Sequence, residues 1–145
     1  MTCFFIGHRD APEDIYAKLR DAVADHITKH GVTDFVVGHY GRFDSMAARA
    51  VREEKGRHPQ VTLTLLLPYY PFTYDAEKYD ASFYPPGMEE VPKPCAIVRA
   101  NQYMLRHSDY LICYCKGYPG NTRALVETAL RRQDAGLLSV AFIEE

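Results

Sequence analysis

The chain has 145 residues, and 47% of them are hydrophobic, which suffices for the core of one domain that depends on neither disulfides nor metal. Its 17 lysines and arginines against 19 aspartates and glutamates give a net charge of -2, which excludes a global electrostatic attraction to nucleic acid or to an anionic membrane. We therefore expect any anion-binding site to be local.

The sequence shows no membrane or secretion signal and no metal motif. No run approaches the roughly 18 apolar residues of a membrane helix, and the first residues lack a signal-peptide pattern. We therefore expect a cytoplasmic protein without a membrane partner. The four cysteines, Cys3, Cys95, Cys113 and Cys115, lack the spacing of a disulfide framework or a zinc site. The sequence thus predicts no metal and no cofactor.

The first segment reads as a strand followed by a helix. Residues 2–6 are apolar and rich in aromatic and β-branched types, and Gly7 closes them, which predicts a buried strand that enters a turn. A capping-box spacing, D-x-x-E, follows at Asp10–Glu13. Apolar residues then recur every four positions in 15–27 and predict a helix that ends at Gly31.

The same order repeats in the next segment. Residues 34–37 are typical of a strand, and a helical pattern that carries Met46 to Val51 follows them. Residues 61–67 form a dense Val/Leu run in which only Thr62 and Thr64 are polar, as expected for a strand covered on both faces. The order to this point is β-α-β-α-β.

Residues 68–94 interrupt this alternation. They hold six of the nine prolines of the chain and seven aromatic residues. A long connection without an obvious element is usually functional or disordered, and the aromatic content argues against disorder. We expect a partly ordered insertion that acts as a lid or packs at an edge, with one helical turn around 76–79.

The last segment returns to the alternation, and the whole chain, 1–145, reads as a single domain. A helix is expected at 96–107, a strand at 110–114, a helix at 122–132 and a strand at 138–143. The sequence therefore predicts an α/β fold, a Rossmann-like three-layer domain with a mainly parallel sheet of about five strands and a long aromatic and proline-rich insertion.

Ligands of open parallel sheets bind beyond the carboxyl ends of the strands, so the loops there hold the candidate residues. After the first strand, Gly7 allows close approach of the backbone, and Arg9 can bind phosphate or carboxylate in a bidentate manner, with His8 between them. A tight turn with a surface arginine is the simpler alternative. After the second strand, Gly38 and Gly41 begin a second candidate turn.

The second turn continues with Arg42 as a further phosphate ligand, while Asp44 is expected mainly to cap the next helix. The third candidate is the helix opening Pro119–Thr122, in which Gly120, Asn121 and Thr122 offer backbone N–H groups and a hydroxyl to an anion. On the helix before the fourth strand, Arg99 and Asn101 could reach a base or a ribose. These additional ligand-binding candidates are Arg42, Asp44, Arg99, Asn101, Gly120, Asn121 and Thr122.

Four segments together carry a resemblance to a known family. They are Cys3–Arg9, Gly38–Asp44 with the alanines after it, Asn101–Met104 and Pro119–Thr122. In their order they resemble the SLOG superfamily, whose pattern has an F-x-G-H-R start, a Gly-Gly-x-x-Gly-Phe-Asp turn, an Arg-Asn-x-Tyr-Met helix and a Gly-Gly-Thr helix opening. The resemblance implies a Rossmannoid fold and a nucleotide or nucleotide-derived ligand held by the glycine loops.

The resemblance is to the small stand-alone bacterial members and, more remotely, to lonely-guy-type nucleotide phosphoribohydrolases and DNA-processing proteins. The phosphoribohydrolase branch has a P-G-G-x-G-T-x-x-E motif whose glutamate serves in N-glycosidic cleavage. In this chain Leu125 stands at that position, and Glu127 lies two residues further, which rotates it by about 200° on a helix. No catalytic residue is therefore assigned.

Two functions remain open. The first is the binding or sensing of a nucleotide-derived small molecule. The alternative is a hydrolase or ribosyltransferase acting on a nucleotide N-glycosidic bond, with Asp75, Glu77 or Asp80 of the insertion as the carboxylate, although solvated loop charges are the simpler interpretation. Nucleic acid is not expected as a partner, because acidic residues accompany the aromatic ones. A homodimer is compatible with the fold class, but no patch requires one.

Overall fold

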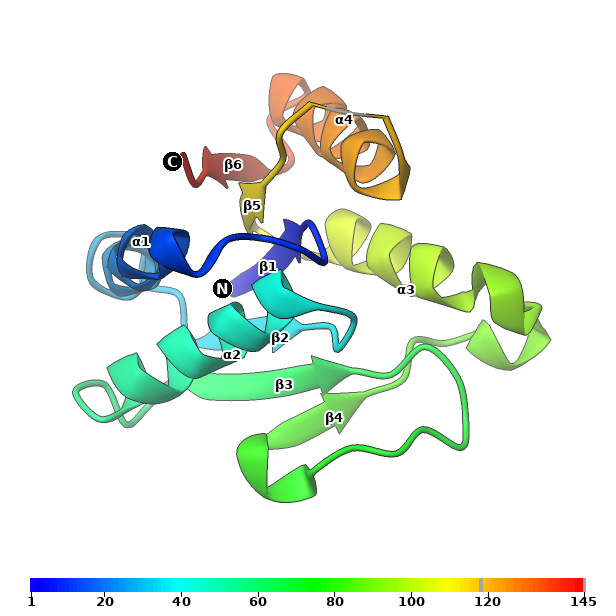
Figure 1. Ribbon diagram of the computed structural model, residues 1–145, viewed down its shortest axis with the longest axis horizontal. Coiled ribbons are helices and arrows are strands. Elements are labelled where there is room, and N and C mark those ends of the chain that lie inside the picture. Colours follow the sequence, from blue (N-terminus) through cyan, green and yellow to red (C-terminus); the bar gives the residue numbers. More distant parts are fainter. Residues whose placement is uncertain (118, 145) are drawn as a thin grey trace.

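The computed structural model describes residues 1–117 and 119–144, and within them the chain forms one six-stranded sheet (Figure 1). The strands are β1 (Thr2–Gly7), β2 (Asp34–Val37), β3 (Thr62–Leu66), β4 (Ala81–Phe83), β5 (Tyr110–Tyr114) and β6 (Ser139–Phe142). They lie in the order β4-β3-β2-β1-β5-β6, and every neighbouring pair is parallel. The order reverses between β1 and β5.

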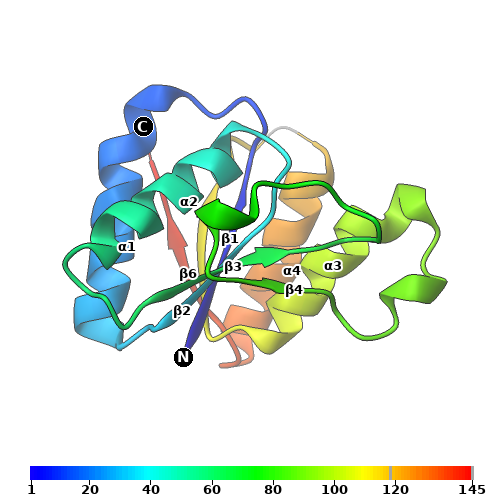
Figure 2. The ribbon, with the colours of Figure 1, turned by 90° about the horizontal axis from the view of Figure 1, so that it is seen from below.

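Two helices cover each face of the sheet (Figure 2). On one face lie α1 (Tyr16–His30) and α2 (Arg42–Lys55), and on the other α3 (Lys93–His107) and α4 (Asn121–Asp134). The predicted α/β class and the Rossmann-like three-layer arrangement are confirmed. The sheet has one strand more than the five expected, and it is parallel throughout.

The alternation of side chains along β1 explains the two layers. Cys3 and Phe5 pack in the core beneath α1 and α2, while Phe4 and Ile6 pack in the core beneath α3 and α4. All four residues are at most 5% exposed. A strand that buries both of its faces reads as a continuous apolar run, which is the pattern that predicted β1.

The predicted insertion 68–94 contains β4, the strand that the sequence did not predict. β4 pairs with β3 from Thr64 opposite Ala81, and the 3₁₀ turns η2 (Ala76–Lys78) and η3 (Met88–Glu90) lie on either side of it. The helical turn expected around 76–79 is therefore present. Asp80 joins this segment to β3 and α2, because its carboxylate accepts a hydrogen bond from the Leu63 backbone N–H at 2.8 Å and pairs with the Lys55 ammonium.

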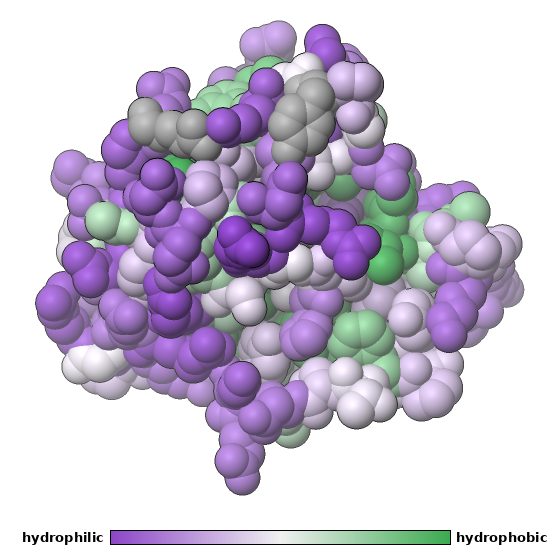
Figure 3. All heavy atoms as spheres, in the orientation of Figure 1, coloured by the Kyte–Doolittle hydropathy of each residue, from purple (hydrophilic) through white to green (hydrophobic). Residues whose placement is uncertain are grey.

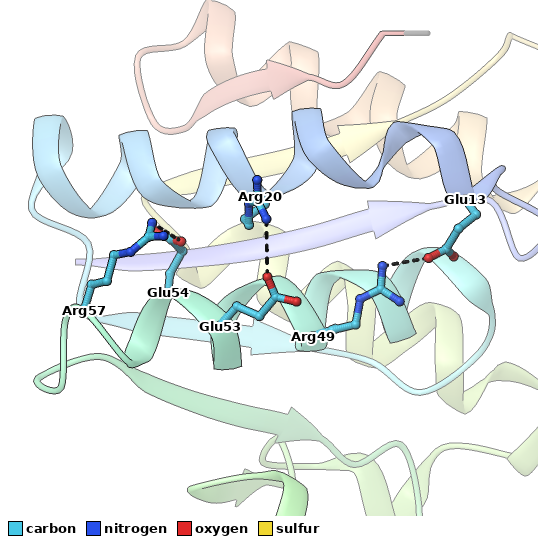
Figure 4. A network of polar contacts seen from close by, with 6 residues as sticks. All are labelled: Glu13, Arg20, Arg49, Glu53, Glu54 and Arg57. Atoms are coloured by element: carbon cyan, nitrogen blue, oxygen red, sulfur yellow. Dashed lines mark hydrogen bonds and ion pairs between the residues drawn. The ribbon is translucent and has the colours of Figure 1, made fainter.

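The start of the first helix differs from the capping-box prediction, which is wrong. A 3₁₀ turn, η1 (Glu13–Ile15), precedes α1, and no side chain caps either element. Glu13 instead pairs with Arg49 of α2 at 2.7 Å, and Arg20 of α1 faces Glu53 of α2 at 3.6 Å (Figure 4). These pairs are exposed, so they orient the two helices more than they stabilise the fold.

The outer edge of β6 is partly closed. The Val140 backbone N–H, which points away from β5, donates a hydrogen bond of 2.7 Å to the Gln133 side-chain carbonyl. This contact satisfies a group that a neighbouring copy could otherwise use to extend the sheet. The homodimer stays a prediction.

None of the helices in the described ranges combines the length and the apolar character needed to cross a membrane.

Candidate functional site

A pocket lies at the carboxyl ends of the strands, next to the reversal of strand order between β1 and β5. Its volume is about 250 Å³, and its walls come from the loops after β1 and β2, from α3 and from the first turn of α4. We call it the first pocket. Figure 3 shows hydrophobic surface beside α3, bordered by hydrophilic side chains. The predicted site residues that line the first pocket are Gly7, His8, Arg9, Gly38, Gly41, Asp44, Asn101, Asn121 and Thr122.

The loop after β1 is held in place by contacts on both sides. A methyl group on Gly7 would overlap the buried ring of Phe43, so only glycine fits here. His8 is 5% exposed, and its Nε2 accepts a 2.9 Å hydrogen bond from the Lys116 backbone N–H. Burial lowers the pKa of His8, which keeps the ring neutral as this acceptor role requires. His8 thus joins the loop after β1 to the loop after β5.

Arg9 lies at the mouth of the first pocket with an exposed side chain. No hydrogen bond or ion pair connects its guanidinium to any residue that the structure describes. The Arg9 carbonyl accepts the Arg42 backbone N–H at 2.9 Å, and a Cβ on Gly41 would lie 2.5 Å from the Arg9 Cα. Glycine at 41 therefore lets the two loops touch, and the guanidinium is left available for an anion.

Asp44 is the one acidic residue among the described residues that line this pocket. The prediction that it caps the helix after β2 is wrong. The helix α2 begins at Arg42 with Gly41 at the N-cap, so Asp44 is the third helical residue. Its Oδ2 accepts the Tyr40 backbone N–H at 3.2 Å. Burial raises the pKa of the Asp44 carboxyl to about 7, and the bond from Tyr40 opposes this shift only in part. Both protonation states are therefore accessible near neutral pH.

Tyr40 lines the first pocket and was not among the predicted residues. Its hydroxyl oxygen is buried, and within the described part of the chain it has no hydrogen-bond partner. Burial, followed by the neighbouring Asp44 and Tyr69, raises the pKa of this phenol. A Cβ on Gly38 would lie 2.7 Å from the Tyr40 ring, so glycine allows the ring to lie across the loop. An aromatic residue between two loop glycines was the available signal in the sequence.

The first turn of α4 forms the opposite wall. Gly120 is the N-cap at φ 148°, a conformation that favours glycine, and it stands outside the set of lining residues, whereas Asn121 and Thr122 belong to it. The described first turn of α4 carries no acidic residue and no side-chain cap. Its partial positive charge therefore remains available to an anion.

The helix α3 contributes one of the two residues predicted from it. Asn101 lines the first pocket together with Ile97 and Val98, four and three residues before it on the same face. Arg99 points away from this face, is exposed, and lines neither pocket of the described structure. Leu125 of α4 completes an apolar side of the pocket.

A second pocket of about 610 Å³ adjoins the first. The two share Arg9, Gly38, Tyr40, Gly41 and Ile97. The second pocket is also lined by His39, Arg42, Ser45 and Tyr79. Arg42, predicted for the same turn as Gly41, therefore belongs to the second pocket, where its Nη1 donates to the Ala11 carbonyl at 3.3 Å.

The other carboxylates considered from the sequence lie outside both described pockets. Glu127 is exposed and pairs with Arg123 of the same helix at 3.0 Å. Asp75 accepts the Glu77 backbone N–H at 3.2 Å, and Asp80 is occupied by Leu63 and Lys55. Asp44 is the carboxylate that the fold brings to the site.

The fold and the site together define a parallel α/β domain with a polar pocket at its switch point, which is where such domains bind ligands. Among residues 1–117 and 119–144, no cluster of three or more His, Cys, Asp or Glu side chains could hold a metal ion. Comparison with protein-family models gives no match, and comparison with curated proteins gives none either. The SLOG resemblance therefore depends on the sequence motifs alone.

Proposed function

We propose that the chain binds a small nucleotide-derived molecule in the first pocket. The observation that carries the proposal is the convergence of Arg9, Asn101 and Thr122, which are far apart in the sequence, on one pocket at the switch point. Arginine, amide and hydroxyl groups are the donors that phosphates, bases and sugars require. The SLOG motifs, which overlap these residues, support the same ligand class.

The charges around the pocket favour one orientation of the ligand. Asp44 lies in the first turn of α2 and opposes an anion there, whereas α4 begins without an acid. The phosphate is therefore placed between Arg9 and the first turn of α4 at Asn121 and Thr122. Asp44 and Asn101 are left to accept and donate hydrogen bonds to hydroxyl groups or a base edge.

Calorimetry and thermal shift with AMP, GMP, CMP and UMP test the binding function. We expect at least one monophosphate to bind, and Arg9→Ala to weaken it by about 10- to 100-fold, since a charge-assisted hydrogen bond contributes about 1.5–3 kcal/mol. Arg106→Ala, an exposed arginine at the far end of α3, is the matched control and should leave the affinity unchanged. If none of the four nucleotides binds or stabilises the protein, the proposal is contradicted.

A second function, cleavage of a nucleotide N-glycosidic bond, is favoured by one observation. The Asp44 carboxyl lies in the pocket with a pKa raised to about 7 by burial, and this range suits a general acid. The structure thus offers Asp44, in place of the insertion carboxylates, for this role. Its charge state would allow proton donation to a departing base.

Chromatographic detection of free base released from the four monophosphates tests this second function. If the chain is a hydrolase, Asp44→Asn should abolish release, while Asp75→Asn, which changes an exposed carboxylate outside the pockets, should retain it. Binding of a monophosphate without any release of base leaves the binding function and removes the hydrolase.

A further inference from the structure

The two pockets are neighbours and share part of their lining. Arg9, Tyr40 and Gly41 line both of them, so the two pockets meet at these residues. The first pocket, at about 250 Å³, is smaller than the roughly 300–1,000 Å³ typical of small-molecule sites. The second pocket, at about 610 Å³, supplies the missing room.

The chemistry of the second pocket differs from that of the first. Its described lining includes Arg9 and Arg42 as cations, together with His39, and contains no acidic residue. The first pocket instead carries the Asp44 carboxyl. The insertion contributes Tyr79, whose half-buried ring packs on the core and forms an aromatic wall. A second anionic group followed by a polar ring fits this surface.

Tyr40 lies where the linings of the two pockets meet, and its hydroxyl is buried. A buried hydroxyl without a partner costs free energy, and the described chain offers it none. The Tyr40 hydroxyl oxygen is closed off from solvent, so a phosphate oxygen beside Arg9 would accept this hydrogen bond only after the phenol ring turns towards the pockets.

We propose that the second pocket is a subsite for the distal part of a two-part ligand, a nucleoside diphosphate joined to a second polar group such as a sugar. This inference rests on the proposed function, because the nucleoside and its first phosphate occupy the first pocket. The second phosphate leaves the first pocket beside Arg9 and lies near Arg42, in the pocket whose described lining carries no acidic residue. The sugar then lies against Tyr79.

Calorimetry with two matched series, AMP, ADP and ADP-glucose and UMP, UDP and UDP-glucose, tests the subsite. In the series that binds, we expect the diphosphate sugar to bind about tenfold tighter than the monophosphate, as one added charge-assisted contact predicts. Ser45→Trp fills only the second pocket, and Arg42→Gln removes its charge while keeping an amide donor for the Ala11 carbonyl.

Both variants should cancel the gain of the diphosphate sugar and change monophosphate affinity by less than about twofold, because neither residue lines the first pocket. Equal affinities across a series in the unaltered protein, or a gain that survives both variants, would overturn the subsite and leave the proposed function intact. Failure of every nucleotide to bind would overturn both. The intermediate compounds, ADP and UDP, separate the contribution of the second phosphate from that of the sugar.

Discussion

Replacing Gly7 with alanine is expected to lower the free energy of unfolding by about 3 kcal/mol, near the upper end for an overpacked core position. The new methyl group would overlap the Phe43 ring, which is 1% exposed and stacks on Tyr114 at 6.4 Å between ring centroids. Because β1 and α2 are both fixed by the sheet and the core, the ring cannot move away without disturbing its neighbours. Urea denaturation monitored by circular dichroism measures the loss.

Gly56→Ala is the matched control for this prediction. Gly56 has φ −59° and ψ −31°, and the nearest atom to an added Cβ is the Glu53 carbonyl at 3.3 Å. Alanine adopts this conformation readily, so the change in stability should stay within about 1 kcal/mol. The double variant Gly7→Ala with Phe43→Leu should recover part of the loss. Equal stabilities of the two single glycine variants would contradict the overlap.

Replacing Asp44 with asparagine is expected to stabilise the protein at pH 8 by about 2 to 4 kcal/mol, given about 1.4 kcal/mol for each unit of pKa shift and an opposing contribution from the helix macrodipole. The folded pKa of Asp44 is raised from 3.8 to about 7, so the folded state holds the proton more tightly than the unfolded state. The stability linked to this group is present at low pH and is lost as pH rises through 7. The variant retains an oxygen for the Tyr40 N–H.

Denaturation of the two proteins from pH 4 to pH 8 measures the difference. The advantage of Asp44→Asn should shrink as pH falls towards 4, since both states then carry a neutral carboxyl. Asp21→Asn, an exposed change on α1, provides the control and should show no such trend. The lowered pKa values of His8 and His26 affect both proteins alike and cancel in the comparison. A constant difference across this range would refute the raised pKa of Asp44.

The strands that form the centre of the sheet could be predicted because they bury both faces. Residues of β1 and β5 are nearly all buried, and such runs are visible in a sequence. The edge strand β4 was missed for the opposite reason. Ala81 and Ser82 are exposed and Phe83 is only half-buried, so no apolar run or alternation marks a strand there. Its place depends on pairing with β3.

The candidate site could be predicted as far as it depends on glycine loops after strands. Gly7, Gly38 and Gly41 each avoid a clash that only the folded chain creates, but glycine after a strand already signals a close approach. The role of Asp44 could not be found this way, because its raised pKa depends on the desolvation that only the folded chain creates around it. Arg99 was misplaced because the sequence pattern alone did not fix which face of α3 borders the pocket.

The added edge strand has a consequence for how this protein can be altered. The first pocket is built mainly from the loops after β1 and β2 and from α3 and α4, and it takes only Pro94, in the first turn of α3, from the insertion, whereas the insertion contributes Tyr79 to the second pocket. Residues 68–79 run between two strands at the margin of the sheet and can change in length without shifting its centre. Under the proposed function, exchange of this loop would therefore alter ligand selectivity while preserving the first pocket, which makes the domain a two-module scaffold for engineering.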